Sequence, residues 1–203
     1  MQPRLPFRFP GIAADVERLR VKLKEGLTLI GFAADSPASV LNLACGRADE
    51  TGTLFAALAP SRIGYYLGID LLPGDIAEAT KRWQPETPDT RIEFRAGDAS
   101  RTDRMRELPP FDLVFIRHQN YWHDAPVWDR LLENALTALK PGGVLAITSY
   151  FDREHELALT SLKLRGAELL VNFRNTESRR LDDAPNKSVD RHLALLRSGA
   201  ELP

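Results

Sequence analysis

The sequence of 203 residues predicts an α/β fold: a doubly wound, mostly parallel seven-stranded sheet with helices on both faces. Short apolar runs of strand length alternate with longer segments whose apolar residues recur at helical spacing. The short runs are almost continuously apolar, which is typical of parallel strands that are buried on both faces. The last two runs have no helix-length segment between them. We therefore expect a final hairpin, and with it one antiparallel strand near the C-terminus.

The elements follow from these patterns and from local start and stop signals. Strands are expected at residues 40–43, 63–69, 92–94, 111–116, 144–147, 167–173 and 191–196. Helices are expected at residues 12–32, 51–58, 73–83, 125–139 and 154–163. Pro73 suits the first position of its helix, and Asp124 suits an N-cap. Gly26 is a candidate for dividing the first helix, and the Pro-Gly-Gly run that starts at Pro141 is expected to end the fourth.

Composition limits the domain organisation and the partners. The length fits one main domain, residues 37–203, after an N-terminal extension and helix, residues 1–36, for which two roles are open: a lid or a packed helix. Lys and Arg total 27 against 28 Asp and Glu, so the basic excess of a general nucleic-acid binder is absent. A single cysteine favours a reducing compartment, and no apolar run is long enough to cross a bilayer. We expect a cytoplasmic protein without membrane or metal.

Three successive strands end in turns with small or acidic residues. These turns contain residues 44–46, Asp70, and Gly97 with Asp98. Because the carboxyl ends of parallel strands meet at one edge of the sheet, the turns should lie side by side there. Small residues let the backbone approach a ligand, Asp70 can bind both hydroxyls of a ribose, and Asp98 can accept a bond from an adenine amine. The alternative is that each acid is a solvated loop residue.

These residues resemble the class I S-adenosylmethionine-dependent methyltransferases, which have a Rossmann-like fold. The family pattern is an acid followed by Gly-x-Gly-x-Gly after the first strand, and here N-L-A-C-G-R-A keeps the middle glycine as Gly46. Asn42 replaces the acid, while Ala44 and Ala48 replace the outer glycines. The runs F-D-L-V-F and L-K-P-G-G-V-L match the family's fourth strand and the entry to its fifth. The resemblance extends over residues 38–196.

The resemblance implies S-adenosylmethionine as cofactor, and it assigns a site to it. The positions implied are Asn42, Ala44, Cys45, Gly46, Asp70, Leu71, Asp98, Ala99 and Arg117. The residues near Gly46 would hold the methionine part, and the two aspartates the adenosine. An alanine in this turn adds strain if its backbone needs a positive φ, which would weaken cofactor binding. Two roles are open for Cys45: a reactive thiol at the start of a helix, or, more simply, a small buried residue.

The segment after the fourth strand is where the family places the methyl acceptor. The candidate substrate residues are Asn120, Tyr121, Trp122, His123 and Tyr150. His118 is the candidate catalytic residue, because a histidine can accept a proton from a hydroxyl or thiol. The alternatives are a backbone-bonded histidine and aromatic residues that pack the next helix. An Asn-Pro-Pro-Tyr motif, which amino-group methylating members use on nucleobases and glutamine, is absent.

The sequence thus predicts a methyltransferase that acts on an oxygen, sulfur or nitrogen atom of a small-molecule acceptor. We do not expect nucleic acid as a partner, because the basic residues of loop 174–190 alternate with Asp182, Asp183 and Asp190, as in a solvated loop. The oligomeric state stays open. One alternative is a non-catalytic Rossmann-like binding or scaffold protein, suggested by the altered glycine motif. A nicotinamide oxidoreductase is less favoured, because G-x-G-x-x-G is absent.

Overall fold

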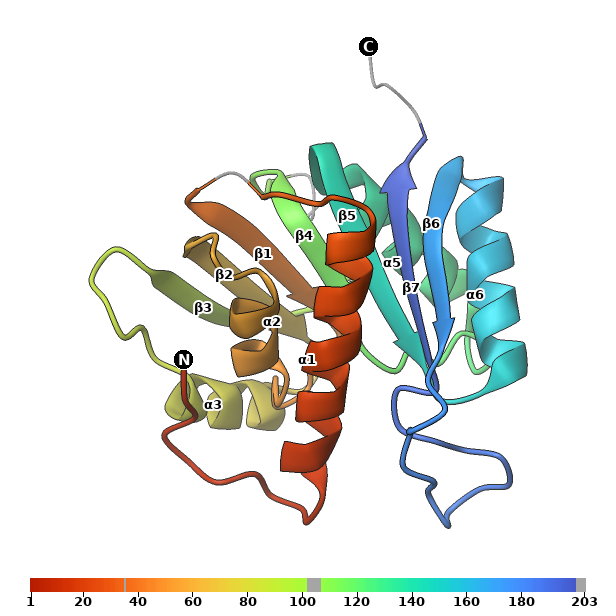
Figure 1. The fold of residues 1–203 in the computed structure, drawn as a ribbon, viewed down its shortest axis with the longest axis horizontal. Coiled ribbons are helices and arrows are strands. Elements are labelled where there is room, and N and C mark those ends of the chain that lie inside the picture. Colours follow the sequence, from red (N-terminus) through yellow and green to blue (C-terminus); the bar gives the residue numbers. More distant parts are fainter. Residues whose placement is uncertain (35, 102–106, 200–203) are drawn as a thin grey trace.

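A computed structural model describes residues 1–34, 36–101 and 107–199. Within them lies one seven-stranded sheet with the order β3-β2-β1-β4-β5-β7-β6 (Figure 1). The strands are β1 (Ala38–Leu43), β2 (Ile63–Asp70), β3 (Arg91–Ala96), β4 (Phe111–Ile116), β5 (Leu139–Ser149), β6 (Ala167–Arg174) and β7 (His192–Ser198). The pairs from β3 to β5 are parallel, and β7 is antiparallel to both of its neighbours. The predicted fold class is confirmed, including the final hairpin.

Helices cover both faces of the sheet, because each buried strand presents apolar side chains to both sides. The described helices are α1 (Ile12–Leu29), α2 (Thr51–Ala57), α3 (Pro73–Arg82), α5 (Ala125–Thr137) and α6 (Asp152–Leu164). In β4, Leu113 and Phe115 join the core under α1 and α2, whereas Val114 and Ile116 join the core under α5 and α6. Figure 1 shows α1 in front of the sheet and α5 behind it.

The structure corrects the expectations for Gly26 and for the Lys-Pro-Gly-Gly run, each for a local reason. Gly26 does not divide α1: a Cβ at this position would come within 2.9 Å of Leu195, so the glycine allows the helix to pack closely on β7. The Lys-Pro-Gly-Gly run does not end α5: the helix ends at Thr137, and the run lies within β5, which begins at Leu139 instead of Val144. There the strand pairs with the start of β4, where Leu139 lies opposite Phe111.

One edge of the sheet gathers segments that are distant in sequence. The carboxyl ends of β1 to β5 lie at this edge, together with residues 1–11, the start of α1 and the loop between β6 and β7 (Figure 1). The loop returns to this edge because β7 runs antiparallel. Arg82 contacts the N-terminal segment in two ways. Its backbone carbonyl accepts a hydrogen bond from the Arg4 amide (2.9 Å), and its guanidinium lies 5.6 Å from the centroid of the Phe7 ring.

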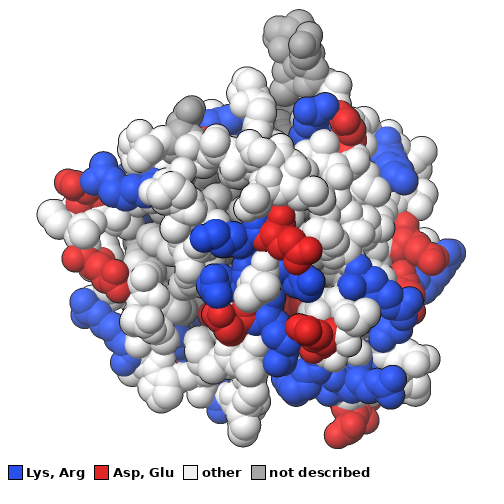
Figure 2. Space-filling model, in the orientation of Figure 1, with Lys and Arg blue, Asp and Glu red and all other residues white. Residues whose placement is uncertain are grey.

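The surface in this view carries both signs of charge. Figure 2 shows acidic and basic side chains interspersed over the face that α1 covers. On α1, Arg20 pairs with Glu17 and Lys22 pairs with Glu25, one turn along the helix in each case. None of the helices in the described part of the chain is long and apolar enough to cross a membrane.

Candidate functional site

The turn between β1 and α2 has a left-handed backbone at three positions. Ala44, Gly46 and Ala48 have φ values of 52°, 52° and 53°. This conformation costs an L-residue about 1–2 kcal/mol, so both alanines are strained. The strain is held in place by the surroundings: the Cys45 amide donates to Ile69 (3.1 Å), and the Trp83 indole N–H donates to the Ala48 carbonyl (2.8 Å).

Asp70 lies directly beside this turn. Its carboxylate accepts the Gly46 amide at 2.8 Å and the Leu72 amide at 2.9 Å, one with each oxygen. A carboxylate has about four acceptor positions, so these bonds fix its orientation and leave positions for further donors. The neighbouring Leu71 side chain is exposed. Asp70 is therefore placed at the Gly46 turn with unused capacity for hydroxyl groups.

Asp98 and Ala99 continue the same line of strand ends. The Gly97 amide donates to the Asp70 carbonyl at 2.8 Å, which joins the turn after β3 to the end of β2. Asp98 Oδ1 accepts the Ser100 amide (2.9 Å) and hydroxyl (2.7 Å). Ala99 is buried in the core. The turns after β1, β2 and β3 thus form one continuous edge, as the strand pattern predicted.

Asn42 is directed into the core instead of toward this edge. It is fully buried, and its amide donates to Glu50 and to the Tyr66 hydroxyl (2.9 Å). Glu50 is also buried, and burial raises its carboxyl pKa even though Arg117, 3.5 Å away, opposes the shift. Asn42 therefore acts on the strand-end region through Glu50.

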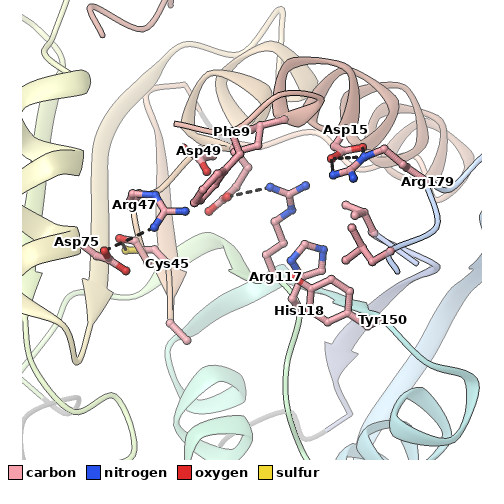
Figure 3. Close-up of a pocket in the computed structure, with 16 residues that line it drawn as sticks. Phe9, Asp15, Cys45, Arg47, Asp49, Asp75, Arg117, His118, Tyr150 and Arg179 are labelled. Carbon is pink, nitrogen blue, oxygen red and sulfur yellow. Dashed lines mark hydrogen bonds and ion pairs between the residues drawn. The ribbon is translucent and has the colours of Figure 1, made fainter. Parts of the chain in front are cut away.

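A cavity of about 310 Å³ lies between the Gly46 turn, the N-terminal segment and the loop between β6 and β7 (Figure 3). The predicted site residues that line it are Ala44, Cys45, Gly46, Arg117, His118 and Tyr150. Burial raises the pKa of the Cys45 thiol well above its ordinary value, so this cysteine is not an activated nucleophile. The cavity joins the end of β1 to the ends of β4 and β5.

Arg117 and Asp190 form a buried ion pair at the wall of the cavity. Arg117 Nη2 lies 2.6 Å from Asp190 Oδ2, and Nε lies 3.1 Å from Oδ1. The Thr148 hydroxyl adds a bond to Oδ1 at 2.9 Å. Burial alone would raise the pKa of Asp190, but Arg117 and His118 hold it far below its usual range. The Asp190 carboxylate is thus permanently charged.

His118 is held by the same carboxylate. Its Nε2 lies 2.9 Å from Asp190 Oδ1 and 3.2 Å from the Asp190 amide nitrogen, whose N–H donates to this ring nitrogen. Burial lowers the pKa of His118, Asp190 opposes this shift, and Arg117 adds to it. The imidazole is therefore neutral at pH 7. Its ring stacks on Tyr150 at 3.9 Å.

The other predicted substrate residues lie outside the cavity. The Tyr121 hydroxyl donates to Asp129 at 2.8 Å, which attaches this side chain to α5. Trp122 packs against Phe151, with ring centroids 4.8 Å apart, and is 47% exposed. Asn120 and His123 are exposed. Of the predicted substrate set, the structure places Tyr150 alone at the cavity.

Several residues of the cavity carried no local sequence signal. They are Phe9, Asp15, Glu50 and Arg179, and the same holds for Asp190, which pairs with the lining residue Arg117. Loop 174–190 was expected to be solvated, yet Asp190 is 4% exposed, and Arg179 crosses to α1, where its Nη2 lies 2.5 Å from Asp15. The pairs Arg117–Asp190 and Arg179–Asp15 join residues that are distant in sequence, so only the folded chain shows them.

Comparison with known proteins identifies the family. A family model described as a methyltransferase domain matches residues 40–143. The chain belongs to this family. An mRNA cap guanine-N(7) methyltransferase 1 from Arabidopsis thaliana is 30% identical over 130 residues, which are 57% of this chain and 34% of the relative. The chain therefore spans about a third of the length of that relative.

Solved methyltransferases share the fold of this methyltransferase domain. An S-adenosylmethionine-dependent methyltransferase from Clostridium acetobutylicum ATCC 824 aligns with a TM-score of 0.65 at 13% identity, over 91% of this chain and 92% of that chain. The N-methyltransferase NodS from Bradyrhizobium japonicum WM9 aligns with a TM-score of 0.62 at 22% identity, over 91% and 98%. The resemblance to class I methyltransferases that the sequence predicted is confirmed.

The expectation about partners needs correction. The sequence favoured a small-molecule acceptor and argued against nucleic acid, but the Arabidopsis relative is named for the guanine of an mRNA cap. The expectation that nucleic acid is not a partner rested on the net charge of the whole chain and on the alternation of charges in one loop. Neither quantity describes local recognition of a base or a phosphate, so neither excludes such a partner.

Proposed function

We propose that this domain is an S-adenosylmethionine-dependent methyltransferase. The observation that carries the proposal is the contact of 2.8 Å between the Gly46 amide and Asp70, at the edge where the strand order sets the turns of β1, β2 and β3 side by side. Asp70 keeps unused acceptor positions there, which fits ribose hydroxyls, and Asp98 follows on the next strand. The residues present therefore fit the cofactor.

Each part of the site has a role in this proposal. S-adenosylmethionine, when bound, supplies an activated methyl group. The turn at Ala44, Cys45 and Gly46 would bind the methionine part, Asp70 with Leu71 the ribose, and Asp98 with Ala99 the adenine. Arg117 would keep the neighbouring carboxylates oriented. The protein contributes mainly alignment and exclusion of water, and alignment by itself can lower a barrier by roughly 7–11 kcal/mol.

We assign to His118 the proton transfer that some acceptors need. This role places the ring proton on Nε2, directed at Asp190 Oδ1 2.9 Å away, so that Nδ1 can accept a proton from a hydroxyl, thiol or N–H nucleophile. With an acceptor that must lose a proton, such as a hydroxyl or a thiol, His118→Ala should lower kcat by roughly 10²–10⁴-fold and change cofactor affinity little. A matched variant is His123→Ala, at an exposed position outside the cavity. Equal losses of kcat and cofactor affinity in His118→Ala would contradict this role.

For the acceptor, we infer a purine base carried by a nucleotide or by RNA. The name of the Arabidopsis relative supports this class, and two aromatic side chains, Phe9 and Tyr150, line the cavity. A ring nitrogen with a free lone pair releases no proton, so His118 would then orient the base, and His118→Ala would change KM more than kcat. Methyl transfer from radiolabelled cofactor to a dinucleotide cap analogue tests the class. Absence of transfer to this analogue and to GTP would contradict it.

Calorimetric titration with S-adenosylmethionine tests the cofactor directly. Asp70→Ala should weaken binding by about 1–3 kcal/mol, because two buried ribose hydroxyls would lose their acceptor. Asp89→Ala is the matched control, since Asp89 pairs with Arg62 on the exposed surface. If the unmodified protein binds no cofactor at millimolar concentration, the proposal is wrong. If Asp70→Ala binds as tightly as the unmodified protein, the ribose lies elsewhere.

A second candidate is cofactor binding without methyl transfer. The strained alanines at positions 44 and 48 favour it, because glycine is the residue that takes this backbone conformation without cost. This candidate predicts cofactor binding together with the absence of product from every acceptor tested. Turnover of a single acceptor would exclude it.

A further inference from the structure

Three arginines line the cavity (Figure 3), and two of them make short contacts to carboxylates. Arg117 holds Asp190 through two bonds of 2.6 and 3.1 Å. Arg179 holds Asp15 through contacts of 2.5 and 3.0 Å. These two guanidinium groups have short carboxylate partners within the protein. The third, Arg47, does not.

Arg47 has only distant charged neighbours. The carboxylate oxygens that approach it lie 3.7 Å away on Asp75 and 3.9 Å away on Glu78, beyond hydrogen-bond length. Its Nε is buried and has no hydrogen-bond partner among the described residues. The Phe9 ring lies 5.4 Å from the guanidinium. A desolvated donor without a partner is costly, and an anionic ligand would remove that cost.

The position of Arg47 indicates which anion. It follows Gly46 directly, so its side chain reaches the end of the cavity formed by the β1 turn, as Figure 3 shows. A guanidinium presents parallel N–H groups in one plane, which matches the two oxygens of a carboxylate. Asp75 lines the same end, and its negative charge suits an ammonium group. Together these two side chains match the zwitterion of an amino acid.

We propose that Arg47 binds the carboxylate of the amino-acid part of S-adenosylmethionine. This inference rests on the proposed function. The sequence argument assigned the methionine part to the backbone of residues 44–46 alone, so the arginine is an additional binding residue. It acts on affinity for the cofactor, and its effect can be measured without an acceptor.

The test compares two ligands that differ at this group. Calorimetry is performed with S-adenosylmethionine and with decarboxylated S-adenosylmethionine, which keeps the adenosine, the sulfonium and the amine. The unmodified protein should bind the first about 10–100-fold more tightly. Arg47→Gln should lose that preference, because it should weaken the binding of S-adenosylmethionine and leave the binding of the decarboxylated ligand unchanged. Arg47→Lys keeps the charge but not the planar fork and should retain part of the preference.

Controls separate this inference from the proposed function. Arg62→Gln removes the same charge at an exposed ion pair and should leave both affinities within about twofold. If the unmodified protein binds neither ligand, the proposed function fails, and the inference fails with it. If the protein binds both ligands equally, or if Arg47→Gln keeps the preference, the cofactor site stands and the assignment of Arg47 is overturned. If Arg47→Gln does not fold, the affinities of Arg47→Lys for the two ligands are compared instead, and a preference as large as that of the unmodified protein would overturn the assignment.

Discussion

The two halves of the strand-end region are built in different ways. One half, with Gly46, Asp70 and Asp98, is called the cofactor half after the role proposed for it, and it is made of turns whose carboxylates accept nearby backbone amides and one hydroxyl. The charged half, with Arg117, His118 and Asp190, is made of buried side chains that pair over long sequence distances. The first half depends on local backbone shape. The second depends on the complete tertiary fold.

This difference predicts where substitutions act. Loss of a carboxylate from the cofactor half should affect ligand affinity more than stability, because its partners are amides that water can reach. Loss of a carboxylate from the charged half should affect stability first, because a buried cation loses its counter-charge. The following variants are arranged from the largest expected effect to the smallest.

Asp190→Ala should lower the free energy of unfolding by about 3–5 kcal/mol, because it leaves the Arg117 guanidinium buried without its main partner. Urea unfolding followed by circular dichroism measures this. Asp183→Ala lies in the same loop but removes an exposed pair with Lys187, and it should leave the midpoint unchanged. If the two variants unfold alike, the charged half is not held together by Asp190.

The charged half should also respond to pH through Glu154, which lies beneath Tyr150. Burial raises the pKa of Glu154 to about 7 in the folded protein from 4.5, against the pull of the Tyr150 and Phe151 amides. The folded state therefore holds more protons than the unfolded state between pH 4.5 and 7, and this contribution to stability is lost as pH rises through that range.

Glu154→Gln removes this dependence. Relative to the unmodified protein, the variant should gain about 2 kcal/mol more at pH 7 than at pH 5. Urea unfolding at both pH values measures the difference. Glu156→Gln, at an exposed position of the same helix, is the control. A gain that is equal at both pH values would mean that Glu154 is already ionised in the folded protein at pH 5.

Ala44→Gly tests whether the backbone of the cofactor half is strained at residue 44. Glycine relieves the left-handed strain of about 1–2 kcal/mol but costs about 0.5–1 kcal/mol of backbone entropy. Stability should therefore rise slightly, by up to about 1 kcal/mol, in urea unfolding. Ala57→Gly, within α2, supplies the opposite expectation, a loss of about 1 kcal/mol. A loss in both variants would show that residue 44 is not strained.

The sequence predicted the cofactor half better than the charged half, for a physical reason. Gly46, Asp70 and Asp98 follow strands directly, so the strand order alone brings them together. Asp190 reaches His118 only because β7 runs antiparallel and returns its preceding loop to the same edge. The expected hairpin did not reveal which loop residue would face inward. Asn42 is the opposite case, a residue that the sequence placed in the site but that lies elsewhere. Its position suggested a ligand contact, but its side chain points into the core.

The place of Asp190 in the chain has a consequence for biosynthesis. A nascent polypeptide that has reached residue 174 contains six of the seven strands, together with Arg117 and His118, but not Asp190, the carboxylate that contacts both side chains. Until β7 inserts between β5 and β6, strand β6 has no neighbour in the sheet and the Arg117 guanidinium lacks its nearest carboxylate. Completion of the sheet and assembly of the charged centre therefore depend on the same segment of chain, residues 174–198.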